Sequence, residues 1–174
     1  SSLVGSEMCI RDRFKIDNFC SVEECNQIIE ALKEIAGEFH DNYHIGKSHG
    51  HNPLKHETVY QILKPKLNLL FGAGKFYSAW GNIIQPGKWI MEHNHDQHVD
   101  NYKRPFTCTN LFLGGDTSTG TRFDGETHEN QIGQLQIFPS ALRHDVPHNE
   151  TDEFRYSLVI DVLPIRFDKD WIKV

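Results

Sequence analysis

The chain has 174 residues and a formal net charge of −6. That length is enough for one domain with a buried core, and the acidic balance argues against a general electrostatic affinity for nucleic acid. No apolar run approaches the roughly 18 residues that a membrane-spanning helix needs, so no membrane partner is expected. The four cysteines form no Cys-x-x-Cys pair, and we expect reduced thiols in a cytoplasmic protein.

Residues 1–13 differ from the rest of the chain, because they have neither helical nor strand periodicity. Their basic residues come last and their apolar run is short, which argues against a signal peptide. The string resembles the read-through translation of a sequencing adapter. We therefore expect a non-native tail at 1–13 and a single domain over 14–174.

Two helices are predicted in the first half of the chain. An alternating stretch at 14–19 favours a short entry strand. Ser21 and Glu24 form a capping box, and the apolar spacing that follows predicts a helix to about residue 39. A second helix is predicted over 58–71, with a kink or a break at Pro65.

The segment between these helices, 40–56, is polar and contains glycine and proline. Five histidines lie in it: His40, His44, His49, His51 and His56. We interpret it as a solvated loop, and a role as a lid or in metal binding stays open at this point.

Short strands separated by turns fill the second half. A hairpin is predicted from strands at 76–84 and 88–95 around the turn 85–87. Further strands are predicted over 106–113, 121–123, 134–138 and 155–163, whereas 144–152 is expected to be a loop. Two helices followed by many short strands are typical of a mainly β (α+β) jelly roll with helices packed on one sheet.

The strand predicted over 88–95 ends in two imidazoles. Strand alternation places Trp89, Met91, His93 and His95 on one face, which begins apolar and ends in His93 and His95. A third histidine, His144, follows a separate strand. Imidazoles that converge at the end of a β-core are suited to a transition metal.

A rival metal-binding pair lies just downstream, at His98 and Asp100. A carboxylate would neutralise part of the metal's charge, which favours this pair chemically. Continued alternation, however, would place it on the same face as Glu92 and Asn94, which are poor residues to point into a core. A bulge could change that face, so the sequence leaves both registers open and favours His93 with His95.

Besides the histidines, Arg155 is an unusual residue of the predicted β-region, because it is charged within an apolar strand. It begins an otherwise apolar strand and shares a face with Ser157 and Val159. A buried arginine is costly unless it is paired, and its planar fork binds a carboxylate bidentately. The partner is either an internal acidic residue or an acidic cosubstrate beside the metal.

These motifs resemble a family of 2-oxoglutarate- and iron(II)-dependent oxygenases that is common in phage and marine bacterial sequences. Members show His-x-His where other branches show His-x-Asp. The resemblance covers 14 to about 163 and rests on these residues: Trp80, Asn82, Gly87, His93, His95, the Phe138-Pro139-Ser140 motif, His144, Arg155, Tyr156 and Ser157. A longer loop before 106 than expected and the His98–Asp100 string depart from the pattern.

The resemblance implies a double-stranded β-helix in which His93, His95 and His144 hold Fe(II). Arg155, helped by Ser157, would hold the distal carboxylate of 2-oxoglutarate, the cosubstrate. Dioxygen and an unidentified substrate would complete the reaction, a hydroxylation that also yields succinate and carbon dioxide.

Two other functions compete with this interpretation. One is a cupin-like metal-dependent dioxygenase without 2-oxoglutarate, in which Arg155 would be paired internally. The other is a non-catalytic jelly-roll binding module, in which the rings of His93 and His144 would lie far apart.

Overall fold

The computed structural model describes residues 13–36, 44–45, 52–96, 106–163 and 172–174. Its elements are β1 (Phe14–Ile16), α1 (Val22–Ala36), β2 (His44–Ile45), the 3-10 helix η1 (Pro53–Lys55), α2 (Glu57–Phe71), β3 (Phe76–Ile84), β4 (Ile90–His93), β5 (Thr107–Gly115), β6 (Thr121–Phe123), β7 (Glu126–His128), β8 (Leu135–Pro139), β9 (His144–Val146), β10 (Arg155–Leu163) and β11 (Ile172–Lys173).

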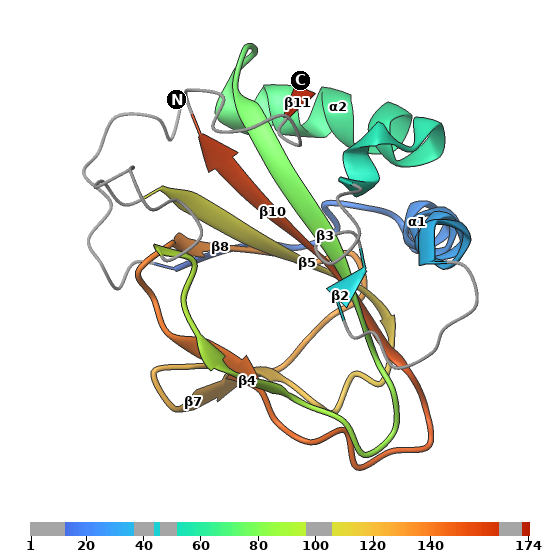
Figure 1. Cartoon of the computed structure of the whole chain (residues 1–174), viewed down its shortest axis with the longest axis vertical. Helices are drawn as coiled ribbons and strands as arrows, with labels where there is room; N and C mark the ends of the chain where they lie inside the picture. Colours follow the sequence, from blue (N-terminus) through green and yellow to red (C-terminus); the bar gives the residue numbers. More distant parts are fainter. Residues whose placement is uncertain (1–12, 37–43, 46–51, 97–105, 164–171) are drawn as a thin grey trace.

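The strands form two antiparallel sheets, and the helices cover only the larger one (Figure 1). The larger sheet has the order β1-β8-β5-β10-β3-β11, with β2 also paired to β3. The smaller sheet has the order β4-β9-β6-β7. From β3 to β10 the chain alternates between the two sheets, except that the consecutive strands β6 and β7 are paired within the smaller one. This path is consistent with the double-stranded β-helix predicted from the sequence.

That alternation corrects the predicted hairpin of 76–84 and 88–95. β3 belongs to the larger sheet and β4 to the smaller one, so the two strands are not paired. The segment after the turn pairs instead with a distant loop, since Gly87 N donates to Asn149 O at 2.7 Å and Asn149 N donates to Lys88 O at 2.9 Å. The turn residues at 85–87 are compatible with a hairpin, but the segment that follows them forms its hydrogen bonds with a distant part of the chain instead of with β3.

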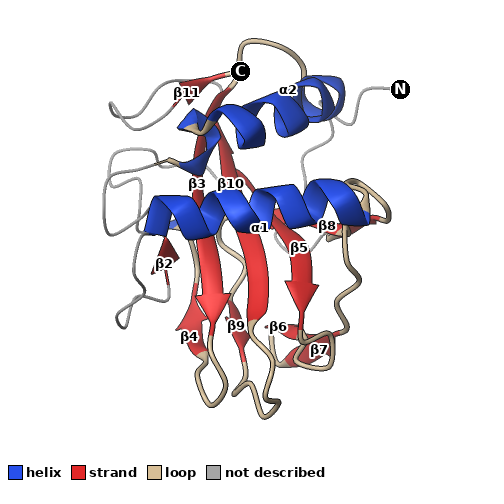
Figure 2. Ribbon diagram, turned by 90° about the vertical axis from the view of Figure 1, so that its right-hand side faces the viewer, coloured by secondary structure: helices blue, strands red, loops and turns tan. Residues whose placement is uncertain are grey.

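Helix α1 begins where the capping box predicted. Ser21 N donates to Glu24 Oε2 at 2.8 Å, and Glu24 N donates to Ser21 Oγ at 3.1 Å. Helix α2 is one element with Pro65 inside it, so the predicted break does not occur. Figure 2 shows both helices lying across the same face of the larger sheet. No described helix is both long enough and apolar enough to cross a bilayer.

The two faces of the larger sheet have opposite characters. The helix-covered face is apolar, and on β10 it presents Leu158, Ile160 and Val162 to the main hydrophobic cluster. The alternate residues of β10 point toward the smaller sheet and include three buried polar side chains: Arg155, Ser157 and Asp161. Because burying polar groups is costly without partners, these side chains mark the inner space as the candidate functional site.

We predict that Gly133, just before β8, tolerates no side chain. Its φ is +78°, and a Cβ atom there would lie 2.0 Å from the carbonyl oxygen of Cys20. Gly133→Ala should therefore lower the free energy of unfolding by about 2–5 kcal/mol, from left-handed strain and overpacking together. Gly125→Ala is the matched control, because Gly125 also has a positive φ (+85°) but open space around it. Urea unfolding of both variants measures the difference, and equal losses would contradict the predicted clash.

Candidate active site

A bulge in β4 decides which side chains face the inner space. Ile90 pairs with Val146 and His93 with His144, so β4 has one more residue between these pairs than β9. In a regular strand Ile90 and His93 would point to opposite faces, but one extra residue brings both to the same face. Ile90 is 8% exposed and belongs to a small apolar cluster between the sheets.

The bulge overturns the prediction that Trp89 and Met91 lead inward to His93. Trp89 is 46% exposed and Met91 is 75% exposed, so both lie on the outer side. The strand also ends at His93 and not at residue 95. His93 reaches the inner space for a different reason from the one that the sequence suggested.

His95 lies beyond the end of β4 and is held by contacts from distant segments. Its backbone N–H donates to Ser140 O at 2.8 Å, directly after β8. Its ring is fully buried and packs against Trp80, with ring centroids 5.2 Å apart, and against Phe138 at 5.9 Å. The Phe138-Pro139-Ser140 motif therefore positions His95.

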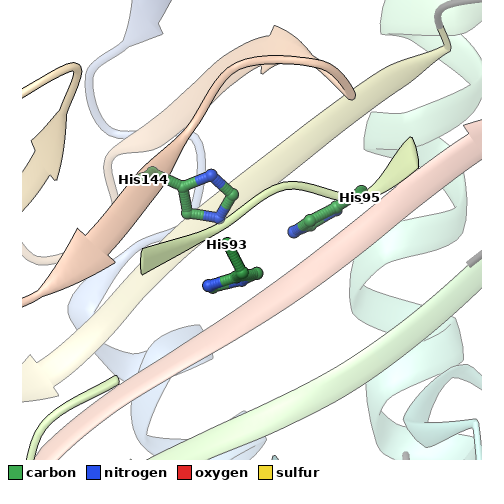
Figure 3. Close-up of side chains that lie close together, drawn as sticks. All are labelled: His93, His95 and His144. Carbon is green, nitrogen blue, oxygen red and sulfur yellow. The ribbon is translucent and has the colours of Figure 1, made fainter. Parts of the chain in front are cut away.

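The imidazoles of His93, His95 and His144 converge (Figure 3). The ring centroids of His93 and His144 are 4.3 Å apart, those of His95 and His144 are 5.0 Å apart, and those of His93 and His95 are 5.5 Å apart. One ring nitrogen from each residue lies within 4.8 Å of the other two. Three such nitrogens could hold one metal ion.

Hydrogen bonds identify the ring nitrogen that carries the proton in His93 and in His144. His93 Nδ1 bonds to Met91 O at 2.9 Å, and His144 Nδ1 bonds to Leu142 O at 3.0 Å. A carbonyl oxygen can only accept, so each Nδ1 carries the proton, and Nε2 of each neutral ring keeps its lone pair. This is the tautomer that metal binding through Nε2 requires.

His144 is electrically suited to the same role. Burial, and then the neighbouring imidazoles of His95 and His93, lower the pKa of His144 to about 3. The ring is therefore neutral at pH 7 and can donate its lone pair to a metal. The donor set fits a metal such as iron, for which imidazole is a suitable ligand.

Asp161 is a further candidate site residue, and the sequence analysis did not identify it. Its carboxylate accepts a 2.7 Å hydrogen bond from His95 Nδ1, and both side chains are buried. The available signal was a lone acidic residue in the otherwise apolar run from Leu158 to Leu163. A buried aspartate in such a strand needs a partner inside the protein.

Arg155 lies fully buried on the same strand face as Asp161. It donates from Nε to Thr119 O at 3.1 Å, from Nη2 to Thr121 Oγ1 at 3.0 Å, and over a long 3.5 Å from Nη1 to Ser157 Oγ. These three bonds leave two of its five N–H groups for another acceptor.

The charge of Arg155 is not neutralised within the described residues, where no carboxylate lies within ion-pair distance of it. Burial lowers its pKa to about 10, an effect that Asp116 partly opposes, and the guanidinium therefore stays charged at pH 7. The face of Phe112 lies 5.4 Å from the guanidinium carbon and supplies a cation–π contact. A buried cation of this kind could hold an anionic group.

The rival pair His98 and Asp100 lies outside the described residues, as do most of the histidines predicted in the 40–56 loop. Two described elements, β2 and η1, fall inside that predicted loop. The structure therefore brings together His93, His95 and His144, and it does not test the rival register.

Comparison with known proteins gives a family and a fold. The family model described as Aspartyl/Asparaginyl beta-hydroxylase matches residues 42–164. No curated protein matches the chain at a significant level.

Solved structures that are similar to the chain include two prolyl hydroxylases and an epimerase. The Pseudomonas putida prolyl-4-hydroxylase has a TM-score of 0.59 at 15% identity, with 88% of this chain and 93% of that chain covered. The collagen prolyl hydroxylase of Paramecium Bursaria Chlorella virus-1, in its 2-oxoglutarate complex, has a TM-score of 0.62 at 15% identity, covering 90% and 98%. The α-ketoglutarate-dependent epimerase SnoN of nogalamycin biosynthesis has a TM-score of 0.62 at 12% identity, covering 87% and 77%. At these identities the likeness shows the fold.

The depressed pKa of His144 predicts acid sensitivity of the metal-free protein. In the unfolded chain His144 takes up a proton near its ordinary pKa of 6.5, whereas in the folded chain it stays neutral down to about 3. Stability should therefore fall as the pH drops from 6.5 toward 3, by on the order of a few kcal/mol at the acid end. Above pH 6.5 this group should contribute no pH dependence.

Urea unfolding across this pH range, with a chelator present, measures the effect. His144→Asn should flatten the profile, because its amide can still donate to Leu142 O but does not titrate. His148→Asn, at an exposed position, should keep the unaltered profile. If the profiles of the unaltered protein and His144→Asn coincide, the pKa of His144 is not depressed.

Proposed function

Because the chain belongs to the aspartyl/asparaginyl β-hydroxylase family, we propose that it is a 2-oxoglutarate- and Fe(II)-dependent dioxygenase that hydroxylates a substrate still to be identified. In this reaction one oxygen atom of dioxygen enters the hydroxyl product and the other enters succinate, while 2-oxoglutarate loses carbon dioxide. Bound iron supplies the redox chemistry that couples these two oxidations.

We assign the metal to His93, His95 and His144, through Nε2 of each ring. The assignment is supported by the convergence of the three rings and by the acceptors that occupy each Nδ1. All three protein ligands are neutral, and they leave coordination positions for the cosubstrate.

The observation that carries the proposal is the buried positive charge of Arg155. It faces the space between the sheets on the same strand face as Asp161, which contacts His95. We propose that the two remaining N–H groups of Arg155 hold the distal carboxylate of 2-oxoglutarate, with Ser157 beside it. Charge-assisted bonds of this kind contribute about 1.5–3 kcal/mol each.

The two competing functions lack the features that would favour them. A cupin-like dioxygenase without 2-oxoglutarate was expected to pair Arg155 with an internal acid, and none lies within ion-pair distance among the described residues. A non-catalytic binding module was expected to keep His93 and His144 apart, but their ring centroids are 4.3 Å apart.

The family description makes aspartyl and asparaginyl side chains the first substrates to test, and two of the similar folds are prolyl hydroxylases. A screen of peptides that contain these residues, read by the mass increase of one oxygen atom, would identify the substrate class.

The proposed cofactor and cosubstrate should be detectable without any substrate. Fe(II) and 2-oxoglutarate added together under anaerobic conditions should give a weak visible charge-transfer band, because the cosubstrate binds the ion directly. Either component alone should give no band, and admitting air should slowly form succinate. The proposal fails if neither the band nor succinate appears.

The role of Arg155 predicts a selective loss of cosubstrate affinity. Arg155→Met, which preserves most of the buried volume, should raise the KM for 2-oxoglutarate about 10- to 100-fold, since it removes a charge-assisted carboxylate contact. Arg155→Lys should have a KM for 2-oxoglutarate between those of the unaltered protein and Arg155→Met, because it keeps the charge but loses the planar fork.

Arg122→Met is the matched control for Arg155→Met. Arg122 lies on β6 and donates to Asp145 at 2.7 Å, where the pair is partly solvent-exposed. Its loss should leave the KM for 2-oxoglutarate unchanged. An unchanged KM in Arg155→Met, with iron still bound, would rule out the role of Arg155.

A further inference from the structure

His95 is held differently from the other two imidazoles of the site. His93 and His144 each donate from Nδ1 to a backbone carbonyl two residues earlier in the chain. Their ring orientation is thus fixed locally, by the backbone just before each histidine. His95 lies beyond the end of β4, and its Nδ1 bonds instead to the carboxylate of Asp161, on β10.

Asp161 lies at a position where a buried carboxylate destabilises the fold unless it is paired. It is 2% exposed and lies in the middle of the larger sheet, on the central strand between β3 and β5. A buried carboxylate is costly unless it is paired and hydrogen-bonded. Among the described residues, the only ion pair of Asp161 is with His95, at 2.7 Å. The strand therefore carries a charge whose partner is a candidate metal ligand.

Asp161 also has Cys108 as a neighbour, opposite it in the register of β10 and β5. Burial, and then the Asp161 carboxylate, raise the pKa of the Cys108 thiol well above its usual range. The sulfur therefore keeps its proton at neutral pH. It therefore adds no second negative charge beside the Asp161 carboxylate.

The three histidine ligands carry no negative charge, and the Asp161 carboxylate can supply one. His93, His95 and His144 bind a metal as neutral imidazoles, so the protein ligands themselves remove none of the charge of a divalent ion. A carboxylate that accepts the other ring N–H of a ligand histidine fixes its tautomer and raises its basicity. Asp161 is the described carboxylate in that position.

We propose that Asp161 is the positioning residue of the metal centre: it holds His95 as the Nδ1–H tautomer, directs Nε2 toward the metal, and supplies through His95 the negative charge that the histidine ligands lack. The inference rests on the metal site of the proposed function, but not on 2-oxoglutarate or hydroxylation. The carboxylate does not bind the metal itself and acts on it through the imidazole of His95.

A double-mutant cycle with Co(II) as the probe tests the proposal. In the unaltered protein, titration should give the visible d–d absorption of histidine-bound Co(II). Asp161→Asn, which keeps the shape and an acceptor oxygen but removes the charge, should weaken Co(II) binding about 10- to 100-fold. In a His95→Ala background, Asp161→Asn should cause no further loss, because its effect passes through His95.

Asp145→Asn is the matched control. Asp145 directly follows His144 but is paired with Arg122 on the outer side of β9. Neutralising it should leave Co(II) affinity unchanged. Unchanged affinity in Asp161→Asn, or a full additional loss in the His95→Ala background, would overturn the proposal. So would a near-ultraviolet thiolate band, because it would place Co(II) on Cys108.

A measurement on the unaltered metal-free protein covers the case in which a variant does not fold. In protein labelled with 15N-histidine, the ring nitrogen shifts of His95 should report a proton on Nδ1. A proton on Nε2 would overturn the proposal without any substitution. If Co(II) binds as predicted but no succinate forms with Fe(II), the proposed function fails while the role of Asp161 stands. If no metal binds, both fail.

Discussion

The pairing of β4 with β9 is the interaction on which the candidate active site depends. It sets His93 directly opposite His144, and its bulge turns His93 to the same side as Ile90. Without the extra residue, the inward positions of β4 would alternate differently and His93 would point outward when Ile90 points inward. One irregular pairing in a short strand therefore decides whether two imidazoles meet between the sheets.

β10 supplies the other half of the site from a single strand face. As a central strand it is paired on both sides, with β3 and β5, so its backbone polar groups have partners. Its helix-facing residues are buried against α1 and α2, and this apolar packing compensates for polar residues on the opposite face. The strand can therefore keep Arg155, Ser157 and Asp161 buried and aligned between the sheets.

The fold accommodates several reactions, so the function of the protein depends on these side chains. The similar structures include two prolyl hydroxylases and an epimerase, at 12–15% identity. What these sequences share with the chain is an arrangement of sheets, and such an arrangement does not specify a substrate. The three converging imidazoles and the buried guanidinium are the chemically specific features of this protein.

The sequence by itself determined the helices and most of the strands, and it identified His93, His95, His144 and Arg155 as candidate site residues. These features follow from local periodicity, from capping chemistry at Ser21 and from residues that are costly to bury. Only the tertiary structure decided that β3 and β4 lie in different sheets, that Trp89 and Met91 point outward, and that Asp161 meets His95. Each of these depends on pairing between segments far apart in the chain. Strand alternation assumes a regular strand and cannot reveal a bulge, and one extra residue moves every side chain that follows it to the opposite face.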